Sequence, residues 1–297
     1  FLSIQEGCDK FCSFCVVPYT RGAEYSRPVK DIIIEAKDLI KQGAKEICLL
    51  GQNVNAYHGE YNNTVLSLDK LIFEIANLEG IQRIRYMTSH PADMTEGLIK
   101  AHGEVEALMP YLHLPVQSGD DQVLKAMNRK YNSTEYLSII EKLRDVRSDI
   151  AFSSDIIVGF PGETDRSFEN TLNLVEQVNY SQAYSFKYSR RPGTPGSIMQ
   201  GQVSEDIKTE RLLALQEILD IQQCEFNSAF IGKSMEVLIE RRRRKDNLLV
   251  GKSPYMQAVH LLEDKYDIGN ILRVNVFAAD KNSLKAKSVQ LLSKAAN

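Results

Sequence analysis

The chain has 297 residues, of which 43% are hydrophobic and 25% charged, an ordinary composition for a globular protein of one large or two smaller domains. Five cysteines are too few, and odd in number, for a disulfide framework, and no apolar run approaches the roughly 20 residues that cross a bilayer. The composition therefore excludes a small disulfide-stabilised scaffold, a membrane span and a disordered chain, and it indicates a soluble, cytoplasmic protein. Because the first residue is Phe1 and not Met, we expect the chain to begin inside a longer protein.

Charge is distributed unevenly along the chain. Residues 233–297 carry 13 Lys and Arg against 7 Asp and Glu, a net charge of +6, which leaves −9 on the rest of the chain. A basic module on an acidic body favours a polyanionic partner for the smaller part. The run of Arg241, Arg242, Arg243, Arg244 and Lys245 is either part of that contact or a solvated turn.

The first two thirds of the chain alternate short apolar runs with helical patterns. We predict strands over residues 2–5, 46–50, 83–88, 111–116, 152–158 and 183–188. Helices are expected near residues 29–41, 67–78, 95–102, 134–147 and 167–178. This alternation is typical of parallel strands joined by helical crossovers. Six such units predict an α/β fold, either an open, incomplete barrel or a flat doubly wound sheet.

A long helix and a small β module follow. Residues 204–230 have apolar side chains at helical spacing. From Gly232 the period becomes two, and strands are expected within 235–239, 247–251, 256–262, 271–277 and 284–291. Five short strands of this kind predict a small antiparallel barrel, a shape that often binds oligonucleotides. We therefore divide the chain into residues 1–200, a helical connection over 201–231 and a β module over 232–297.

Three cysteines lie just after the first predicted strand. Cys8, Cys12 and Cys15 have the spacing C-x3-C-x2-C. Three thiolates on one tight loop can hold three corners of a [4Fe-4S] cluster and leave the fourth iron open to a small molecule. Structural zinc is the main competitor, but it needs four protein ligands, and the nearest histidine, His58, is more than 40 residues away. Phe14, beside the last cysteine, would help to keep water from a cluster.

The remaining cysteines and a polar strand face need separate interpretation. Cys48 and Cys224 are each expected to be small buried hydrophobes rather than a fourth ligand. Along residues 112–118, His113 and Gln117 alternate with Leu112, Leu114 and Val116. We expect the apolar face to pack under helices and the polar face to point into the barrel toward a ligand, although a strand histidine can also be a satisfied core residue.

The segment Cys8-Asp-Lys-Phe-Cys12-Ser-Phe-Cys15 resembles the signature of the radical S-adenosylmethionine (SAM) enzymes. The resemblance implies a partial (β/α)6 barrel and a [4Fe-4S] cluster with Cys8, Cys12 and Cys15 as its metal ligands. It also implies SAM as the second cofactor, bound to the open iron. An injected electron would then break a C–S bond of SAM and give a 5′-deoxyadenosyl radical.

Four segments narrow the resemblance to the methylthiotransferases: residues 16–22, 26–28, 50–57 and 88–91. They are most similar to the MiaB type, which acts on N6-dimethylallyladenosine in tRNA, and the β module resembles the RNA-binding TRAM domain. The resemblance implies C2-methylthiolation of that adenosine at tRNA position 37, beside the anticodon. The family holds a second [4Fe-4S] cluster in an N-terminal domain that this sequence does not contain, so we expect the chain alone not to complete sulfur insertion.

The resemblance also implies contacts with SAM at the strand ends. The common Gly-Gly-Glu form is absent, and Gly51, Gln52 and Asn53 stand in its place. The expected cofactor-binding residues are Gly51, Gln52, Asn53, His113, Gln117, Ser118, Ser153, Asp155 and Gly159. A polar loop after the second strand and a simple glycine turn after the fifth are the alternatives to this interpretation.

The partners follow from the same resemblance. The anticodon stem-loop of tRNA is expected to contact Arg21, Arg27, Arg190, Arg191, Arg241, Arg242, Arg243 and Arg244, although Arg27 and Arg191 could equally be structural ion-pair partners. An electron donor such as flavodoxin or ferredoxin is implied, and we expect a monomer without a membrane partner. Two alternatives stay open: a methylthiotransferase for threonylcarbamoyl-adenosine or for a ribosomal protein, and a zinc-stabilised, non-catalytic RNA-binding protein.

Overall fold

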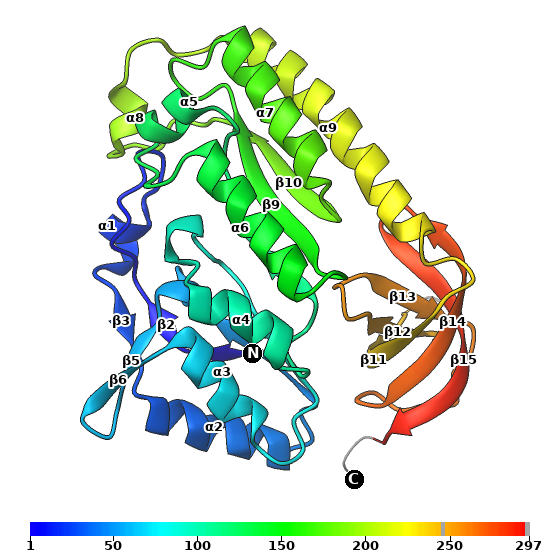
Figure 1. Cartoon of the computed structure of the whole chain (residues 1–297). Coiled ribbons are helices and arrows are strands. Elements are labelled where there is room, and N and C mark those ends of the chain that lie inside the picture. Colours follow the sequence, from blue (N-terminus) through cyan, green and yellow to red (C-terminus); the bar gives the residue numbers. More distant parts are fainter. Residues whose placement is uncertain (245–246, 295–297) are drawn as a thin grey trace.

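The computed structural model describes residues 1–244 and 247–294 (Figure 1). Lys245 of the basic run and residues 295–297 of the predicted β module lie outside the described residues. All six predicted N-terminal strands are confirmed, the first as two short pieces. The strands are β1 (Leu2–Ser3), β2 (Gln5–Glu6), β4 (Glu46–Leu50), β7 (Arg83–Tyr86), β8 (Tyr111–His113), β9 (Ala151–Val158) and β10 (Gln182–Lys187).

The parallel strands follow one another in chain order around a half-open barrel. β1, β4 and β7 form one sheet, and β8, β9 and β10 form another. The sheets meet just before β8, where the Ile84 amide donates to the Ala107 carbonyl at 2.7 Å and the Met109 amide donates to the Ile84 carbonyl at 3.0 Å. A doubly wound sheet reverses its strand order at a switch point, and this order has no reversal. The incomplete barrel is therefore confirmed, and the flat sheet was the wrong alternative.

Helices cover the outer face of the half-barrel, each close to its predicted position (Figure 1). They are α2 (Val29–Lys41), α3 (Leu68–Ala76), α4 (Glu96–Glu104), α6 (Ser133–Val146) and α7 (Asp165–Val178). Their buried residues recur at helical spacing, as Val29, Ile32 and Ala36 do in α2. A capping box of Asn132 and Glu135 begins α6. Local caps and one apolar stripe per helix thus explain why these segments form where they do.

Several short elements escaped prediction. They are α1 (Val17–Arg21), α5 (Asp121–Ala126), α8 (Pro195–Ile198), β3 (Tyr25–Ser26), the 3-10 turns η1 (Val54–Ala56) and η2 (Pro91–Asp93), and a hairpin of β5 (His58–Tyr61) and β6 (Thr64–Ser67). The hairpin turns at Asn62 and Asn63, whose φ angles of 49° and 63° are the left-handed values of a tight two-residue turn. The Asn-Asn pair was the overlooked signal.

The helix α9 (Glu205–Ser228) leads to a closed five-stranded barrel. Its strands are β11 (Ser234–Arg242), β12 (Leu249–Lys252), β13 (Ala258–Leu261), β14 (Ile271–Asp280) and β15 (Ser283–Ser293). The order is β11-β12-β13-β15-β14, and β13 pairs with β15 in parallel. The prediction of an all-antiparallel barrel was wrong for this pair, because closure brings β15 beside β13 in the same direction. The barrel has its own apolar core, which includes Val237, Leu249 and Val274.

Two buried arginines join the half-barrel to the C-terminal barrel. Arg83 Nη1 donates to the Lys252 carbonyl at 3.0 Å, and Arg85 donates to the carbonyls of Ser253 and Pro254 at 2.8 and 2.7 Å. Burial lowers the pKa of Arg83 to about 10. These bonds pair both cations with backbone oxygens of the second module and fix it against β7, and Arg85 Nε also lies 3.1 Å from Glu46 Oε1. Within the described residues, no helix is long and apolar enough to cross a membrane.

Candidate functional site

The loop that follows β2 carries the three cysteines. Its entry is at Gly7, with φ of 73°, where a Cβ atom would stand 2.1 Å from the Ala23 carbonyl oxygen, so only glycine fits. The Cys15 amide then donates to the Cys12 carbonyl at 2.9 Å, which closes a tight turn. Cys12 is buried and Cys8 half-buried. The sequence pattern therefore becomes one compact loop at the carboxyl end of the first strands.

The three sulfurs are close enough to influence one another. Burial raises the pKa of the Cys8 thiol, and Cys12 and Cys15 raise it further by charge repulsion. Burial likewise raises the pKa of Cys15, with a further contribution from Cys12. Without a metal, these raised pKa values favour the neutral thiols. A bound metal ion would stabilise the thiolates, because cysteine binds metals in its deprotonated form.

Each sulfur also has an N–H donor. The Lys10 amide donates to Cys8, the Val17 amide to Cys15 Sγ at 3.4 Å, and Arg129 Nη1 to Cys12 Sγ at 3.4 Å. Hydrogen bonds to cysteine sulfur tune iron–sulfur clusters. Among the described residues, no three His, Cys, Asp or Glu side chains are arranged to hold a single metal ion. Three separate, hydrogen-bonded thiols on one loop fit a [4Fe-4S] cluster, in which each cysteine holds a different iron.

Neighbouring elements fix this loop from several sides. The Ser13 amide donates to the Met127 carbonyl at 2.9 Å, and the Gly196 amide donates to the Ser13 carbonyl at 2.7 Å. Phe14 packs against a small apolar cluster that includes Phe160 and Tyr188. The expectation that aromatic side chains shield this loop from water is therefore consistent with its packing.

The other two cysteines differ in their environment. Cys48 is buried in β4, and burial raises the pKa of its thiol to about 11. Its prediction as a small buried hydrophobe is confirmed. Cys224 is exposed on α9, so the same prediction was wrong for this residue. The pattern of α9 could not reveal this, because a single helix position faces solvent or core according to partners distant in sequence.

Gln5 connects the loop after β4 to the cysteine loop, and sequence reasoning missed it. Its Oε1 accepts the amides of Gln52 and Asn53 at 2.9 and 3.0 Å. Gln52 Oε1 in turn accepts the Gly7 amide at 2.7 Å. A Cβ atom on Gly51 would stand 2.5 Å from Gln5 Oε1. The three residues that replace the Gly-Gly-Glu motif are thus packed directly against the entrance to the cysteine loop.

The polar side chains predicted to line the inner face of β8 and β9 are hydrogen-bonded to one another. Leu112, Leu114 and Val116 pack in the main core, as expected for the opposite face. The Tyr111 hydroxyl donates to Ser153 Oγ at 2.7 Å, and Ser153 Oγ lies 2.8 Å from His113 Nδ1. His113 Nε2 lies 3.7 Å from Asp155 Oδ2. If Ser153 donates to Nδ1, the imidazole carries its proton on Nε2, facing Asp155.

The three remaining cofactor candidates sit at strand ends with different partners. Gln117 has φ of 72°, and its backbone bridges to β9 through the Asp155 carbonyl and the Ile157 amide. Ser118 Oγ instead accepts the Asp120 amide and lies 3.3 Å from the Thr171 hydroxyl of α7. The Ser118 hydroxyl is thus bonded on the helix side of the sheet, and only the backbone of Ser118 is left as a candidate contact for a cofactor.

Gly159 begins a turn that α9 holds in place. Its φ is 70°, and a Cβ atom there would stand 2.3 Å from Lys208 Cγ. Its amide donates to Glu163 Oε1 at 2.7 Å, and the same oxygen accepts Arg211 Nη1 at 2.8 Å. The Glu163–Arg211 pair is buried. Sequence reasoning missed this pair, because Arg211 lies 48 residues farther along the chain.

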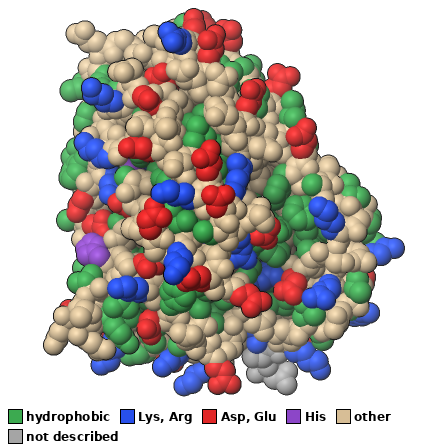
Figure 2. All heavy atoms as spheres, in the orientation of Figure 1, with side chains coloured by type: hydrophobic (Ala, Val, Ile, Leu, Met, Phe, Trp, Pro, Cys, Tyr) green, Lys and Arg blue, Asp and Glu red, His purple; other side chains and the backbone are tan. Residues whose placement is uncertain are grey.

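The arginines predicted to contact RNA fall into two groups. Arg27 pairs with Glu35 at 2.7 Å, which is the structural alternative considered for it, and Arg242 donates to the carbonyls of Asp264 and Tyr266 at 2.9 and 2.8 Å. The exposed members are Arg21, Arg190, Arg191, Arg241 and Arg244, and Arg243 is half-buried. Figure 2 shows Lys and Arg side chains on the visible face of the C-terminal barrel.

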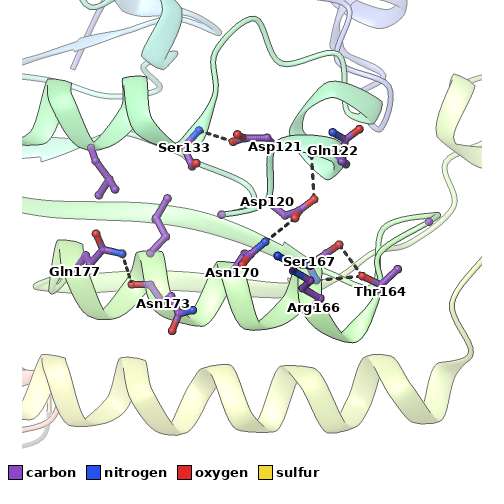
Figure 3. Close-up of a pocket in the computed structure, with 14 residues that line it drawn as sticks. Asp120, Asp121, Gln122, Ser133, Thr164, Arg166, Ser167, Asn170, Asn173 and Gln177 are labelled. Atoms are coloured by element: carbon purple, nitrogen blue, oxygen red, sulfur yellow. Dashed lines mark hydrogen bonds between the residues drawn. The ribbon is translucent and has the colours of Figure 1, made fainter.

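A groove on the helix side of the half-barrel is lined by none of the cysteines. It encloses about 820 Å³ between α5, α6 and α7 and has a polar lining (Figure 3). Its groups bond to one another: Asn170 donates to Asp120 at 2.9 Å, and the Ser133 amide donates to Asp121 at 2.8 Å. Because no predicted site residue lines this groove, we do not take it as the candidate site.

Comparison with known families defines the class of protein. The model of the Radical SAM superfamily matches residues 2–175, from β1 to α7, and the chain belongs to this superfamily. Solved structures agree at the level of the fold. They include the radical SAM methyltransferase TsrM from Kitasatospora setae, with a TM-score of 0.53 and 16% identity over 66% of this chain and 38% of TsrM. Coproporphyrinogen III oxidase (HemN) from Escherichia coli has a TM-score of 0.51 and 14% identity over 96% of this chain and 71% of HemN.

Curated relatives are much more similar in sequence. A protein of Wolbachia sp. subsp. Brugia malayi is 58% identical over 98% of this chain and 66% of its own length. A protein of Agrobacterium fabrum is 54% identical over 97% of this chain and 63% of its own length. Both are named tRNA-2-methylthio-N(6)-dimethylallyladenosine synthase. The chain thus spans slightly less than two thirds of the length of these relatives.

Proposed function

We propose that this chain is the radical-forming and RNA-binding part of a tRNA methylthiotransferase that modifies C2 of N6-dimethylallyladenosine at position 37, beside the anticodon. The observation that carries this proposal is 52–59% identity, over 96–99% of the chain, to proteins named tRNA-2-methylthio-N(6)-dimethylallyladenosine synthase. The second [4Fe-4S] cluster of the family would belong to the part of the protein outside this sequence. The chain alone is therefore expected to form no methylthio product.

Cys8, Cys12 and Cys15 would hold the cluster, with one N–H donor on each sulfur. When bound, the cluster supplies the electron that cleaves SAM, and so allows a hydrogen atom to be removed from an unactivated carbon. The chain's own residues would keep that reaction selective. Phe14 and its apolar neighbours exclude water beside the loop, and the buried Arg129 places a fixed cation next to Cys12.

SAM would lie across the strand ends that face the loop. We assign its contacts to the backbone of residues 51–53, to the backbone of Gln117, Ser118 and Gly159, and to the group of His113, Ser153 and Asp155. Backbone amides and carbonyls at these ends are suited to the amino acid part and the adenine of SAM, and Asp155 to a ribose hydroxyl. Support comes from the location of residues 51–53, 117–118 and 159 after the carboxyl ends of parallel strands, where barrel enzymes bind ligands. Ser153 and Asp155 lie within β9, beside His113.

RNA contacts are proposed on both modules. Arg21, Arg190 and Arg191 are exposed around the half-barrel, and Arg241 and Arg244 are exposed on the C-terminal barrel. The target adenosine lies in a single-stranded loop, so it can be splayed out and inserted toward the cofactors. We further propose a cytoplasmic monomer that receives electrons from a flavodoxin or a ferredoxin.

The test is nucleoside mass spectrometry of tRNA from cells that lack the full-length protein. Returning the gene should restore 2-methylthio-N6-dimethylallyladenosine, and a Cys12→Ser variant should not. A Cys224→Ser variant, which changes an exposed cysteine on α9, is the matched control and should restore the product. Restoration of a methylthio group on threonylcarbamoyl-adenosine instead, or tRNA nucleosides that do not change when the gene is returned, would overturn the substrate assignment.

A further inference from the structure

Two aromatic rings on the inner face of β10 are exposed although the strand belongs to the half-barrel. Tyr184 and Phe186 are 47% and 51% exposed. Alternation along the strand places both rings on the side opposite Ala183, which packs against the main core. Among the described residues, β10 is the last strand of its sheet, so both rings lie at an open edge of the half-barrel. Large rings left open on a concave face indicate a binding surface rather than a core.

The rings border the residues assigned to SAM. In the β9–β10 register, Tyr184 stands opposite Asp155, and Phe186 opposite Ile157. The Tyr184 ring meets the His113 ring edge to face, with centroids 6.3 Å apart. A molecule resting on Tyr184 would therefore lie beside the His113–Asp155 group, where the substrate of a SAM radical must be.

Open space adjoins Tyr184 on the side of the C-terminal barrel. A cavity of about 210 Å³ is lined by Tyr184, Tyr111 and Met87 from the half-barrel and by Lys252 and Met256 from the second barrel. The docked module therefore does not bury the Tyr184 ring, which leaves room beside it for a planar group.

The chain beyond β10 adds positive charge to these rings. Arg190 and Arg191 follow Phe186 within five residues and are exposed, and Arg190 Nε is bonded to Gln202 at 3.0 Å. Proteins hold single-stranded nucleic acid by this combination: aromatic rings stack on the bases, and cations lie along the phosphate backbone.

We infer that Tyr184 and Phe186 are the stacking platform for the unstacked adenine of the RNA substrate, with Arg190 and Arg191 beside its phosphates. The inference rests on the proposed function and names the residues that hold the target base. The rings place the adenine beside His113 and Asp155 and so orient its edge toward the cofactors. The platform is independent of what the base carries on N6, because stacking uses the ring face.

A fluorescent base tests the platform directly. An anticodon stem-loop with 2-aminopurine at the target position is titrated with the full-length protein, since stacking on an aromatic ring quenches this base. Tyr184→Leu and Phe186→Leu should each lose most of the quenching and raise the Kd of the stem-loop about tenfold. Tyr184→Phe, which keeps the ring, should behave like the parent protein. The salt dependence of binding should stay unchanged, because the phosphate contacts remain.

The control is Phe73→Leu, which removes a ring that is 38% exposed on α3. Quenching that persists in Tyr184→Leu, or that falls equally in Phe73→Leu, would overturn the platform while leaving the proposed function intact. A parent protein that does not bind the stem-loop would overturn both.

Discussion

Arg129 Nη1 donates a hydrogen bond to Cys12 Sγ at 3.4 Å, and both side chains are buried. The guanidinium is fixed by further bonds to the Pro115 carbonyl at 2.8 Å and to the Tyr131 hydroxyl at 2.9 Å. A permanent cation therefore stands beside one of the three proposed cluster ligands. Since reduction adds negative charge to a cluster, this cation should favour the reduced state.

Replacing Arg129 by methionine should make the reduction potential of the reconstituted cluster more negative. A hydrogen bond to a charged group contributes about 1.5–3 kcal/mol, which corresponds to a shift of about 60 mV or more for one electron. Anaerobic redox titration measures the shift, with Arg166→Met, an exposed arginine of the helix-side groove, as the control. An unchanged potential in a fully loaded Arg129→Met protein would show that this contact has no electrostatic role.

The buried Glu163–Arg211 pair should dominate the stability of the Gly159 turn. Arg211→Met leaves Glu163 charged and buried without its cation, so we expect a loss of about 3–5 kcal/mol in the free energy of unfolding. The double variant Arg211→Met with Glu163→Gln removes both charges and should recover much of that loss. Urea denaturation measures both values, and a double variant as unstable as the single one would contradict the account.

Acidification should partly rescue the Arg211→Met variant. Burial raises the pKa of Glu163 above its ordinary value, and Arg211 opposes that rise. A carboxyl group whose pKa is raised in the folded state destabilises the fold at pH values above that pKa, where it is charged. This destabilisation is lost as the pH falls below the folded-state pKa and the group binds a proton. Without Arg211 the pKa rises further, so the stability difference from the parent protein should narrow as the pH is lowered from neutral toward the ordinary pKa of a glutamate. A constant difference over this range would exclude the mechanism.

Two glycines beside the cysteine loop provide a matched comparison. Gly7 and Gly22 have φ angles of 73° and 81°, but a Cβ atom would collide with Ala23 only at Gly7 and would meet nothing within 4 Å at Gly22. Gly22, with ψ of −166°, adopts a backbone conformation that is essentially restricted to glycine, so Gly22→Ala should cost about 1–3 kcal/mol from backbone strain alone. Gly7→Ala must also displace the loop, so it should greatly reduce the iron bound after reconstitution. Equal iron contents in the two variants would show that Gly7 does not position the loop.

Exposed arginines of the C-terminal barrel should control how RNA binding depends on salt. Changing Arg241 and Arg244 to glutamine should weaken stem-loop binding and reduce the slope of log K against log salt by about 1.4, or about 0.7 for each lost phosphate contact on a single strand. Arg273→Gln is the control, because Arg273 lies on the same barrel and faces Glu236 at 3.6 Å. Filter binding at several salt concentrations measures the slopes, and equal slopes would remove these two residues from the interface.

The sequence predicted most of the fold because its signals are local. Strand–helix alternation located the half-barrel, a change of period located the C-terminal barrel, and the spacing of Cys8, Cys12 and Cys15 located the candidate site. The Asn62–Asn63 hairpin was also signalled locally but overlooked. What escaped prediction depends on pairs distant in the chain. Gln5 reaches residues 52 and 53, and Arg129 reaches Cys12 across 117 residues.

The same limit explains the errors among single side chains. Cys224 is exposed although its helical pattern suggested burial. The hydrogen bonds of Arg242 to the Asp264 and Tyr266 carbonyls were likewise not visible in the sequence, and its contact with RNA stays a prediction. The parallel pairing of β13 with β15 follows from barrel closure, which no strand pattern records. Tyr184 and Phe186 looked like ordinary strand residues until their position at the sheet edge left them exposed.

Anaerobic reconstitution of the full-length protein with iron and sulfide, followed by assay for 5′-deoxyadenosine from SAM under reducing conditions, tests the central claim most directly. The account predicts SAM cleavage by the parent protein and by Cys224→Ser, and none when Cys8, Cys12 and Cys15 are all changed to serine. Undiminished SAM cleavage by the triple variant, or a parent protein that holds zinc and cleaves no SAM, would contradict it.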